Sequence, residues 1–388
     1  MAPITQAPEA HKSRSNKLDA LRGIAALVVV FHHGLYALDY DAAVRVRVPA
    51  LSELSGYDLA LRLIASVALG EIAVFVFFVL SGAVLMDSLR REGPINMAAA
   101  VRFTGRRVFR IVPAMAVAIV AFAILTHIHL PTYLDRPFSG TSVIRNVLMI
   151  DHGVLGVTWT LRTEMLMVPI LLGLALFRNI FGTMSMIFFL SVSQYFLAHG
   201  VPYFDYLLVH ALTAFGLGAL ATTEMFRTAC KQLPKSTLWL LLAGLVAVRF
   251  VASTSSPLAV FALLWIAAIT VALLYHDRDP NHPLERPTLV FLGRISYGVY
   301  LLHWIVIYWP LGAYQALIGA ERLSANVIPW YFLYMIFVVP VTVLFAVPLE
   351  RFVERPFIEM GHRLFPRGHK RGNVVPLQQE GAKRRLAA

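Results

Sequence analysis

Residues 18–38, LDALRGIAALVVVFHHGLYAL, decide the fold class of this chain. An α-helix needs about 20 mainly apolar residues to cross the hydrocarbon core of a bilayer, and this run has that length. Basic residues precede the run, as in a signal peptide, but no small-residue cleavage site follows it. We therefore interpret the run as a retained first transmembrane helix.

Further apolar runs follow with short gaps between them. Of the 388 residues, 58% are hydrophobic and 14% are charged, whereas soluble domains carry about 25% charged residues. This excludes a soluble globular domain and predicts an all-α, polytopic integral membrane helix bundle with about ten transmembrane helices. We also expect a short interfacial helix within 139–158. The predicted spans are 18–38, 62–86, 108–128, 159–177, 180–199, 206–224, 237–252, 257–275, 289–309 and 329–349.

The basic residues lie mainly between these runs and at the chain ends. We expect a basic head (1–17), a membrane domain (18–357) and a basic, disordered tail (358–388) that contacts membrane lipid. A cytoplasmic N-terminus puts most of the 34 Lys and Arg residues on the cytoplasmic side. The positive-inside rule therefore places both termini in the cytoplasm. Because topology explains the net charge of +12, we expect no nucleic acid partner.

Several functional classes lack support in the sequence. The single cysteine, Cys230, allows no intramolecular disulfide. No GxGxxG, Walker or HExxH pattern occurs, and no spaced set of ligands predicts a metal site. A nucleotide-hydrolysing pump and a zinc hydrolase are therefore not expected.

Ionisable side chains inside the predicted spans mark candidate sites, because such groups are costly in lipid. Arg22 and His33 are eleven residues apart, which places them within about 20° of one helix face and about 16 Å apart along it. The helix then presents a cation near its cytoplasmic end and an imidazole beyond the midplane. Alternatively, Arg22 only reaches the headgroups and a histidine only bonds a neighbouring helix.

The fourth predicted span carries Arg162 and Glu164 near its outer end. We expect Glu164 at a depth similar to that of His33. A carboxylate beside an imidazole can fix its tautomer and raise its basicity, as a general base requires. An ion pair that only joins two helices is an equally good interpretation of these residues.

A basic cluster is expected at the depth of Arg22. It consists of Arg106, Arg107, Arg110 and Arg294. Guanidinium groups bind phosphate oxygens bidentately, so the cluster would suit a polyanionic ligand, although the positive-inside rule alone also explains it. Further candidate pocket residues are Arg162, His303, Ser81, Trp159 and Tyr297. The Ser81–Gly82 pair also predicts close helix packing.

Six short motifs occur in an order that resembles acyltransferase family 3, bacterial membrane enzymes that acylate surface and secreted carbohydrates. They are LDALRG with His33 eleven residues after its arginine, FFVLSG, RRVFRIVP, WTLxxE at 159–164, GRISYGVYLLH at 293–303 and VERPF at 353–357. Together they extend over residues 18–357, which is nearly the whole chain.

This resemblance implies an O-acyltransferase of the bacterial inner membrane. Its donor would be cytoplasmic acyl-CoA, expected to be acetyl-CoA, and no metal is implied. Its acceptor would be a hydroxyl of an extracytoplasmic or lipid-linked carbohydrate, such as a lipopolysaccharide or exopolysaccharide. The resemblance makes Arg22 and His33 the essential pair and Glu164 the family's acidic residue.

Three positions depart from the pattern of this family. Phe75 stands where an acidic residue often precedes the double phenylalanine. Ala83 replaces a bulky residue after Ser-Gly, and Arg162 is an unusual charge inside WTLxxE. These departures affect the expected choice of acceptor and acyl chain.

The combined hypothesis has the CoA phosphates at Arg22 and the basic cluster, with the pantetheine arm extending toward His33. His33 acts as general base or as acyl carrier. Glu164 orients His33, and Arg162 stabilises the oxyanion. The alternatives are a transporter or flippase for a lipid-linked sugar and a structural partner in polysaccharide export. A transporter predicts internal repeats, and the two halves show no self-similarity.

Overall fold

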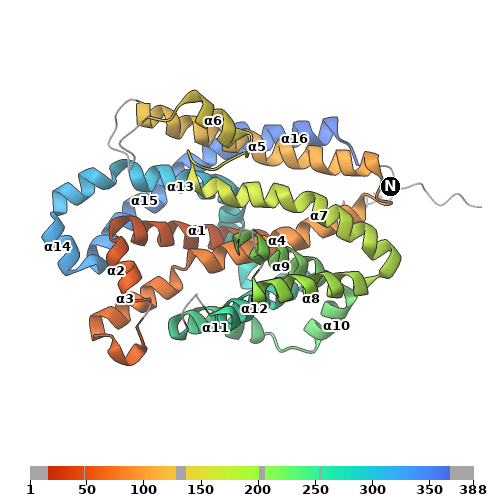
Figure 1. Cartoon of the computed structure of the whole chain (residues 1–388), viewed down its shortest axis with the longest axis horizontal. Coiled ribbons are helices and arrows are strands. Elements are labelled where there is room, and N and C mark those ends of the chain that lie inside the picture. Colours follow the sequence, from red (N-terminus) through yellow and green to blue (C-terminus); the bar gives the residue numbers. More distant parts are fainter. Residues whose placement is uncertain (1–15, 48, 128–136, 201–205, 253–255, 368–388) are drawn as a thin grey trace, which may run out of the picture.

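The computed structural model describes residues 16–47, 49–127, 137–200, 206–252 and 256–367. Within these ranges it contains helices and no strand. Figure 1 shows most of the long helices running roughly along the longest axis of the molecule. The helices are α1 (Asn16–Leu38), α2 (Tyr40–Arg45), α3 (Gly56–Val67), α4 (Gly70–Arg91), α5 (Met97–His127), α6 (Gly140–Val147), α7 (Trp159–Phe181), α8 (Thr183–His199), α9 (Tyr206–Ala221), α10 (Glu224–Lys231), α11 (Thr237–Val251), α12 (Pro257–His276), α13 (Pro287–Ile318), α14 (Ala320–Ala325), α15 (Val327–Leu349), a π-helical turn (Glu350–Glu354) and α16 (Arg355–Leu364).

The all-α prediction is confirmed, and each of the ten predicted spans overlaps a helix, although the span 62–86 crosses the break between α3 and α4 and the span 206–224 extends past the end of α9. Among the described residues, seven segments are long and apolar enough to cross a membrane, or eight if α9 and α10, bent by 72°, form one span. Helices α8 and α11 have 17 and 15 residues, fewer than the roughly 20 that a crossing needs. The predicted number of about ten is therefore not confirmed, since apolar composition locates a helix but does not fix its length.

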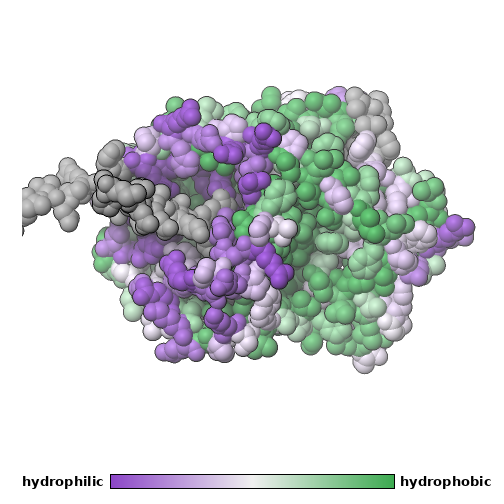
Figure 2. All heavy atoms as spheres, turned by 180° about the vertical axis from the view of Figure 1, so that it is seen from behind, coloured by the Kyte–Doolittle hydropathy of each residue, from purple (hydrophilic) through white to green (hydrophobic). Residues whose placement is uncertain are grey.

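The surface of the molecule is that of a membrane protein. Large apolar side chains are exposed along α7, α8 and α15, among them Phe177, Phe188 and Ile336, whereas soluble proteins rarely expose broad apolar patches. Figure 2 shows a broad hydrophobic band beside an end that is rich in hydrophilic residues. This hydrophilic end is the one at which α1 begins.

Helices α1 and α13 pack closely at the centre of the bundle. At their crossing, a Cβ on Gly23 would meet the backbone of Gly293, and a Cβ on Gly293 would meet the backbone of α1. Only small residues allow two helices to approach this closely in a membrane. The expected close packing at Ser81–Gly82 is also observed, because a Cβ on Gly82 would meet the backbone of Phe215 in α9.

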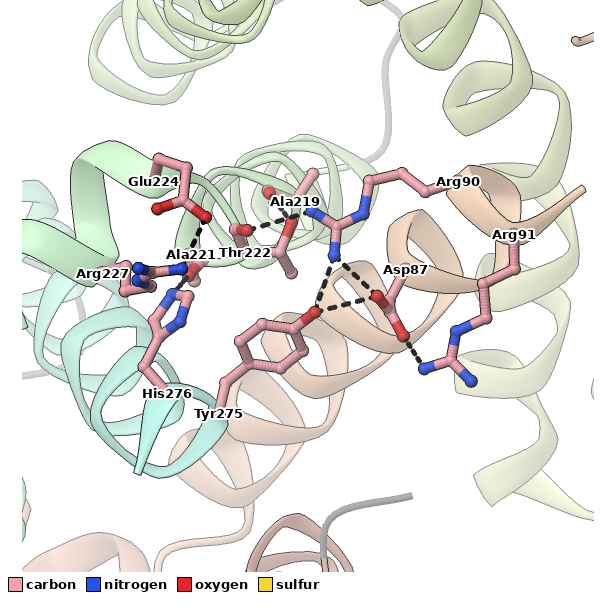
Figure 3. A network of polar contacts seen from close by, with 10 residues as sticks. All are labelled: Asp87, Arg90, Arg91, Ala219, Ala221, Thr222, Glu224, Arg227, Tyr275 and His276. Atoms are coloured by element: carbon pink, nitrogen blue, oxygen red, sulfur yellow. Dashed lines mark hydrogen bonds and ion pairs between the residues drawn. The ribbon is translucent and has the colours of Figure 1, made fainter. Parts of the chain in front are cut away.

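A polar network joins α4, α9 and α12 near the hydrophilic end (Figure 3). Asp87 accepts hydrogen bonds from the Tyr275 hydroxyl at 2.9 Å and from Arg90 at 2.6 Å, and it also pairs with Arg91. Arg90 donates to the carbonyl of Thr222 at 3.2 Å, where α9 turns into α10. The network therefore holds the bend between these two helices.

The predicted head and tail are described only in part. Residues 1–15 and 368–388 lie outside the described residues. Lys17 already belongs to α1 and pairs with Asp277 at 2.8 Å. Burial acts to raise the pKa of Asp277, but the hydrogen bond from Lys17 helps to hold this pKa below its ordinary value. Residues 358–364 form the end of α16, so the start of the predicted tail is helical.

Candidate active site

Four helices, α1, α4, α7 and α13, line two neighbouring cavities. The charged cavity, of about 390 Å³, lies among these helices, α5, the π-helical turn and α16. The histidine cavity, of about 690 Å³, is completed by α9 and α12 and contains His32, His33 and His210 in its wall. Val74 and Tyr300 line both cavities, so one layer of side chains separates them.

The charged cavity takes its name from five arginines and five carboxylates. Arg107 forms an ion pair with Glu164, and the Glu164 carboxylate also accepts a hydrogen bond from Ser81 Oγ at 3.3 Å. Arg294 Nε lies 3.8 Å from Glu350 Oε1. The carboxylates therefore balance the arginines and hold them in place. The ten residues are Asp19, Arg22, Arg107, Arg110, Glu164, Arg294, Glu350, Glu354, Arg355 and Glu359.

The predicted basic cluster is only partly gathered in this cavity. Arg107, Arg110 and Arg294 line it together with Arg22, but Arg106 is not among its described lining residues. Arg106 instead pairs with Glu92 and donates to the carbonyl of Phe365 at 2.8 Å. The expected position of Arg106 is thereby corrected, because successive residues on a helix point about 100° apart and meet different neighbours.

His33 lies in the wall of the histidine cavity and is held by a second histidine. The two facing nitrogens, His33 Nδ1 and His303 Nε2, are 3.0 Å apart, and the two ring planes are inclined by 30° with their centroids 5.1 Å apart. His303 is fully buried, and its Nδ1 lies 3.2 Å from the Val299 carbonyl oxygen. The Trp304 ring packs against His33 with centroids 5.2 Å apart. The imidazole of His33 is therefore fixed on one edge while the cavity lies beside it.

Glu164 is not the partner of His33 that the sequence suggested. Its carboxylate pairs with Arg107 in the charged cavity, whereas His33 lines the histidine cavity. Helix α7 begins inside the bundle at Trp159, which lines the histidine cavity. Glu164 follows about 7.5 Å farther along this helix, beyond the layer that separates the cavities. The expected contact rested on similar depth along two helices, and depth alone does not determine which cavity a side chain faces.

Comparison with known proteins shows to which protein family this chain belongs. A family model described as an acyltransferase domain (Acyl_transf_3) matches residues 15–347. The chain belongs to acyltransferase family 3. It is also 28% identical over 322 residues, 76% of this chain and 73% of the relative, to a protein of Komagataeibacter xylinus named as a putative membrane-bound transacylase, BcsY. No solved structure matches the chain significantly. The protein is thus a multi-pass membrane acyltransferase.

The remaining candidate residues of this acyltransferase divide between the two cavities. Trp159 lines the histidine cavity, whereas Ser81 and Tyr297 line the charged cavity. The Tyr297 hydroxyl donates to the carbonyl of Ile111 at 2.6 Å. The motif residues therefore form the walls of both cavities.

The three departures from the family pattern have different surroundings. Phe75 lines the histidine cavity, and its ring stacks on His210 with centroids 5.6 Å apart. Ala83 is buried where α4 packs on α9. Arg162 is half-buried and is not among the described residues that line either cavity. Its role at an oxyanion stays a prediction.

Two residues of this site were not expected from the sequence. Tyr300, whose hydroxyl donates to the Val157 carbonyl at 3.0 Å, lies in the layer between the cavities. It lies three residues after Tyr297 and three before His303, so the helical period could have revealed it. His210 lies on α9, and nothing in the local sequence connects it to Phe75.

Proposed function

We propose that this acyltransferase moves an acyl group, expected to be acetyl, from cytoplasmic acyl-CoA to a hydroxyl of an extracytoplasmic or lipid-linked carbohydrate. The observation that carries the proposal is the pair of cavities that share Val74 and Tyr300. Helix α1 contributes Arg22 to one cavity and His33 to the other, about 16 Å apart along the helix. A long, flexible donor held in the charged cavity can thus extend its reactive end toward His33.

The charged cavity suits the donor. Its arginines can bind phosphate oxygens bidentately, and the positive-inside rule favours a cytoplasmic location for the end of the molecule at which α1 begins. Arg22, Arg107, Arg110 and Arg294 are the proposed donor-binding residues. Carboxylates already pair with Arg107 and Arg294. The phosphates of the donor would replace these carboxylates as the partners of the two arginines.

The histidine cavity suits the acceptor. A sugar has hydroxyl groups that hydrogen-bond and ring faces that are less polar. The wall of this cavity contains the aromatic rings of Trp159 and Phe75, which can pack on the faces of a sugar ring. It also contains His32 and Glu71, which can hydrogen-bond to sugar hydroxyl groups. The larger volume of about 690 Å³ is also adequate for a sugar and the reacting end of the donor.

His33 is the proposed general base of the transfer. It takes the proton of the acceptor hydroxyl while the hydroxyl oxygen attacks the thioester carbonyl carbon. The new C–O bond forms, the C–S bond breaks, and CoA leaves as a thiol that carries the proton away from His33. A positioned base of this kind contributes about 10²- to 10⁴-fold to a rate.

Replacement of His33 tests this assignment. In the His33→Ala variant, transfer of label from radiolabelled acetyl-CoA to the glycan fraction of a deletion strain should fall by about 100-fold or more. Binding of CoA, measured by calorimetry, should be unchanged. His199→Ala is the matched control, because His199 is exposed at the end of α8 and is not among the described residues that line either cavity, so this variant should retain transfer. Undiminished transfer in His33→Ala contradicts the role proposed for His33.

Two further measurements separate this proposal from its alternatives. Mass spectrometry of surface glycans with and without the gene identifies the acceptor and the acyl group. An acyl group trapped on His33 without acceptor would assign His33 as a covalent carrier instead of a base. A flippase would move lipid-linked sugar without consuming acyl-CoA.

A further inference from the structure

The hydrogen bonds around His33 determine which of its two nitrogens is available for chemistry. We propose that His303 is a positioning residue that holds His33 in the tautomer with hydrogen on Nδ1, so that Nε2 is the atom that acts in the histidine cavity. This inference rests on the proposed role of His33 as base. It assigns to His303 the orienting role that the sequence suggested for Glu164.

The first step of the argument concerns the Val299 carbonyl. A carbonyl oxygen only accepts hydrogen bonds, so His303 Nδ1, 3.2 Å away, carries the hydrogen of that ring. A neutral imidazole has a single N–H. The other nitrogen of His303, Nε2, therefore presents a lone pair.

The second step transfers this constraint to His33. His33 Nδ1 lies 3.0 Å from His303 Nε2, which presents a lone pair, so Nδ1 donates to it; the backbone of Val29 is a second hydrogen-bond partner of the His33 ring. The single N–H of neutral His33 is then on Nδ1, and its Nε2 carries the lone pair. Because His33 lines the histidine cavity while its Nδ1 edge faces His303, the basic nitrogen is the one left to the cavity.

The opposite tautomer of His33 would require an unfavourable state of His303. If His303 donated from Nε2 while its Nδ1 still donated to Val299, it would be a cation with 0% of its surface exposed. If it donated from Nε2 alone, the lone pair on Nδ1 would face the carbonyl oxygen of Val299. A buried charge in a membrane interior and an opposed pair of acceptors are both costly.

A neutral histidine is also well suited to this place in the fold. During transfer His33 becomes an imidazolium, and His303 Nε2 accepts the hydrogen bond from its Nδ1–H throughout. A carboxylate would do the same, but it would have to be kept ionised beside an uncharged imidazole when the enzyme is at rest. His303 avoids the cost of that permanent buried charge.

The test compares two variants of His303 with the wild-type protein. In His303→Gln, the side-chain oxygen can still accept from His33 Nδ1, whereas His303→Leu removes the acceptor. The whole protein is labelled with ¹³C and ¹⁵N in its histidines and reconstituted in lipid nanodiscs without substrate. The signals of His33 are assigned as those that disappear in His33→Gln, and the ring shifts report which nitrogen carries hydrogen.

We expect the Nδ1–H form of His33 in the wild type and in His303→Gln, and a mixture of both tautomers in His303→Leu. Transfer from labelled acetyl-CoA to the glycan fraction should retain most of its kcat in His303→Gln. In His303→Leu, kcat should fall by about 100-fold, with little change in the KM for acetyl-CoA.

An Nε2–H form of His33 in the wild type, or an unchanged tautomer in His303→Leu, overturns the proposal. Because the tautomer is read without substrate, its failure is distinct from a failure of the proposed function. That second failure would appear as a normal tautomer together with undiminished transfer in His33→Ala.

Discussion

The two cavities differ in how they hold their polar side chains. In the charged cavity, arginines and carboxylates compensate one another, as in the pairs of Arg107 with Glu164 and of Arg294 with Glu350. In the histidine cavity, His33 is held by His303, and His32 Nδ1 lies 3.2 Å from the Ala68 carbonyl oxygen. One cavity is thus organised by paired charges and the other mainly by hydrogen bonds of imidazole rings.

This difference follows from the cost of burying charge. Paired charges are tolerated near the hydrophilic end, where the partners compensate one another and a ligand with phosphates can exchange with a carboxylate. Deeper in the bundle a neutral imidazole avoids most of that cost, yet it can still gain and lose a proton during a reaction. The comparison therefore agrees with the proposal that one cavity recognises the donor and the other carries out the transfer.

The largest expected effect concerns the boundary of the charged cavity. Arg106→Met should destabilise the protein by about 3 kcal/mol, because the buried carboxylate of Glu92 loses its nearer cation and keeps only Arg102, at 3.5 Å. The Glu92 side chain has 0% of its surface exposed, and that of Arg106 has 9%. Unfolding by heat and by denaturant in detergent measures this loss.

Affinity for CoA separates this structural role of Arg106 from a role in binding. The folded fraction of Arg106→Met should bind CoA as the wild type does. Adding Glu92→Gln to Arg106→Met should restore part of the stability. A variant with normal stability and weakened CoA binding would instead mean that Arg106 takes part in donor binding at the charged cavity.

The case of Arg106 shows what periodicity can and cannot predict. The sequence places Arg106 and Arg107 on one helix at one depth, and the structure agrees. Which of them lines the cavity depends on neighbours elsewhere in the chain, such as Glu92 and Phe365. Helical period fixes the face of a residue but not what lies against that face.

The histidine cavity gives the same lesson. The placement of Arg22 and His33 on one helix with about 16 Å between them could be predicted from α1 alone. The pairing of His33 with His303 could not, because it depends on the close crossing of α1 and α13 at Gly23 and Gly293. The sequence therefore predicted which residues line the cavities better than it predicted their partners.

The next prediction tests whether the two cavities act as one path. Val74 lines both of them, so Val74→Trp should fill the layer between them and keep the thioester from reaching His33. Misplacement of reacting groups by about 1 Å can cost about 100-fold in rate, and we expect at least that loss of transfer. CoA binding, measured by calorimetry, should stay close to that of the wild type.

Val74→Leu is the matched control, because it changes the size of this side chain only slightly. It should retain most of the transfer activity. Full activity of Val74→Trp would show that acyl groups do not pass this layer, and the cavities would then have independent roles.

The smallest expected effect distinguishes two arginines within the charged cavity. Arg110 is half-buried, whereas the side chain of Arg294 is 60% exposed and lies 3.8 Å from Glu350. A hydrogen bond to a charged group contributes about 1.5–3 kcal/mol, so Arg110→Gln should weaken CoA binding by about tenfold or more. An exposed ion-pair partner contributes about 1 kcal/mol or less, so Arg294→Gln should weaken it by about fivefold at most.

Calorimetric titration with CoA at low and at high salt checks this order. Salt screens exposed charges more than buried ones, so the contribution of Arg294 should shrink as salt is added while that of Arg110 largely persists. Equal losses in the two variants, with equal dependence on salt, would mean that the donor phosphates lie at the exposed rim of the charged cavity. In that arrangement the depth of Arg110 would have no role in binding, and the pantetheine arm would have to extend farther to bring the thioester to His33.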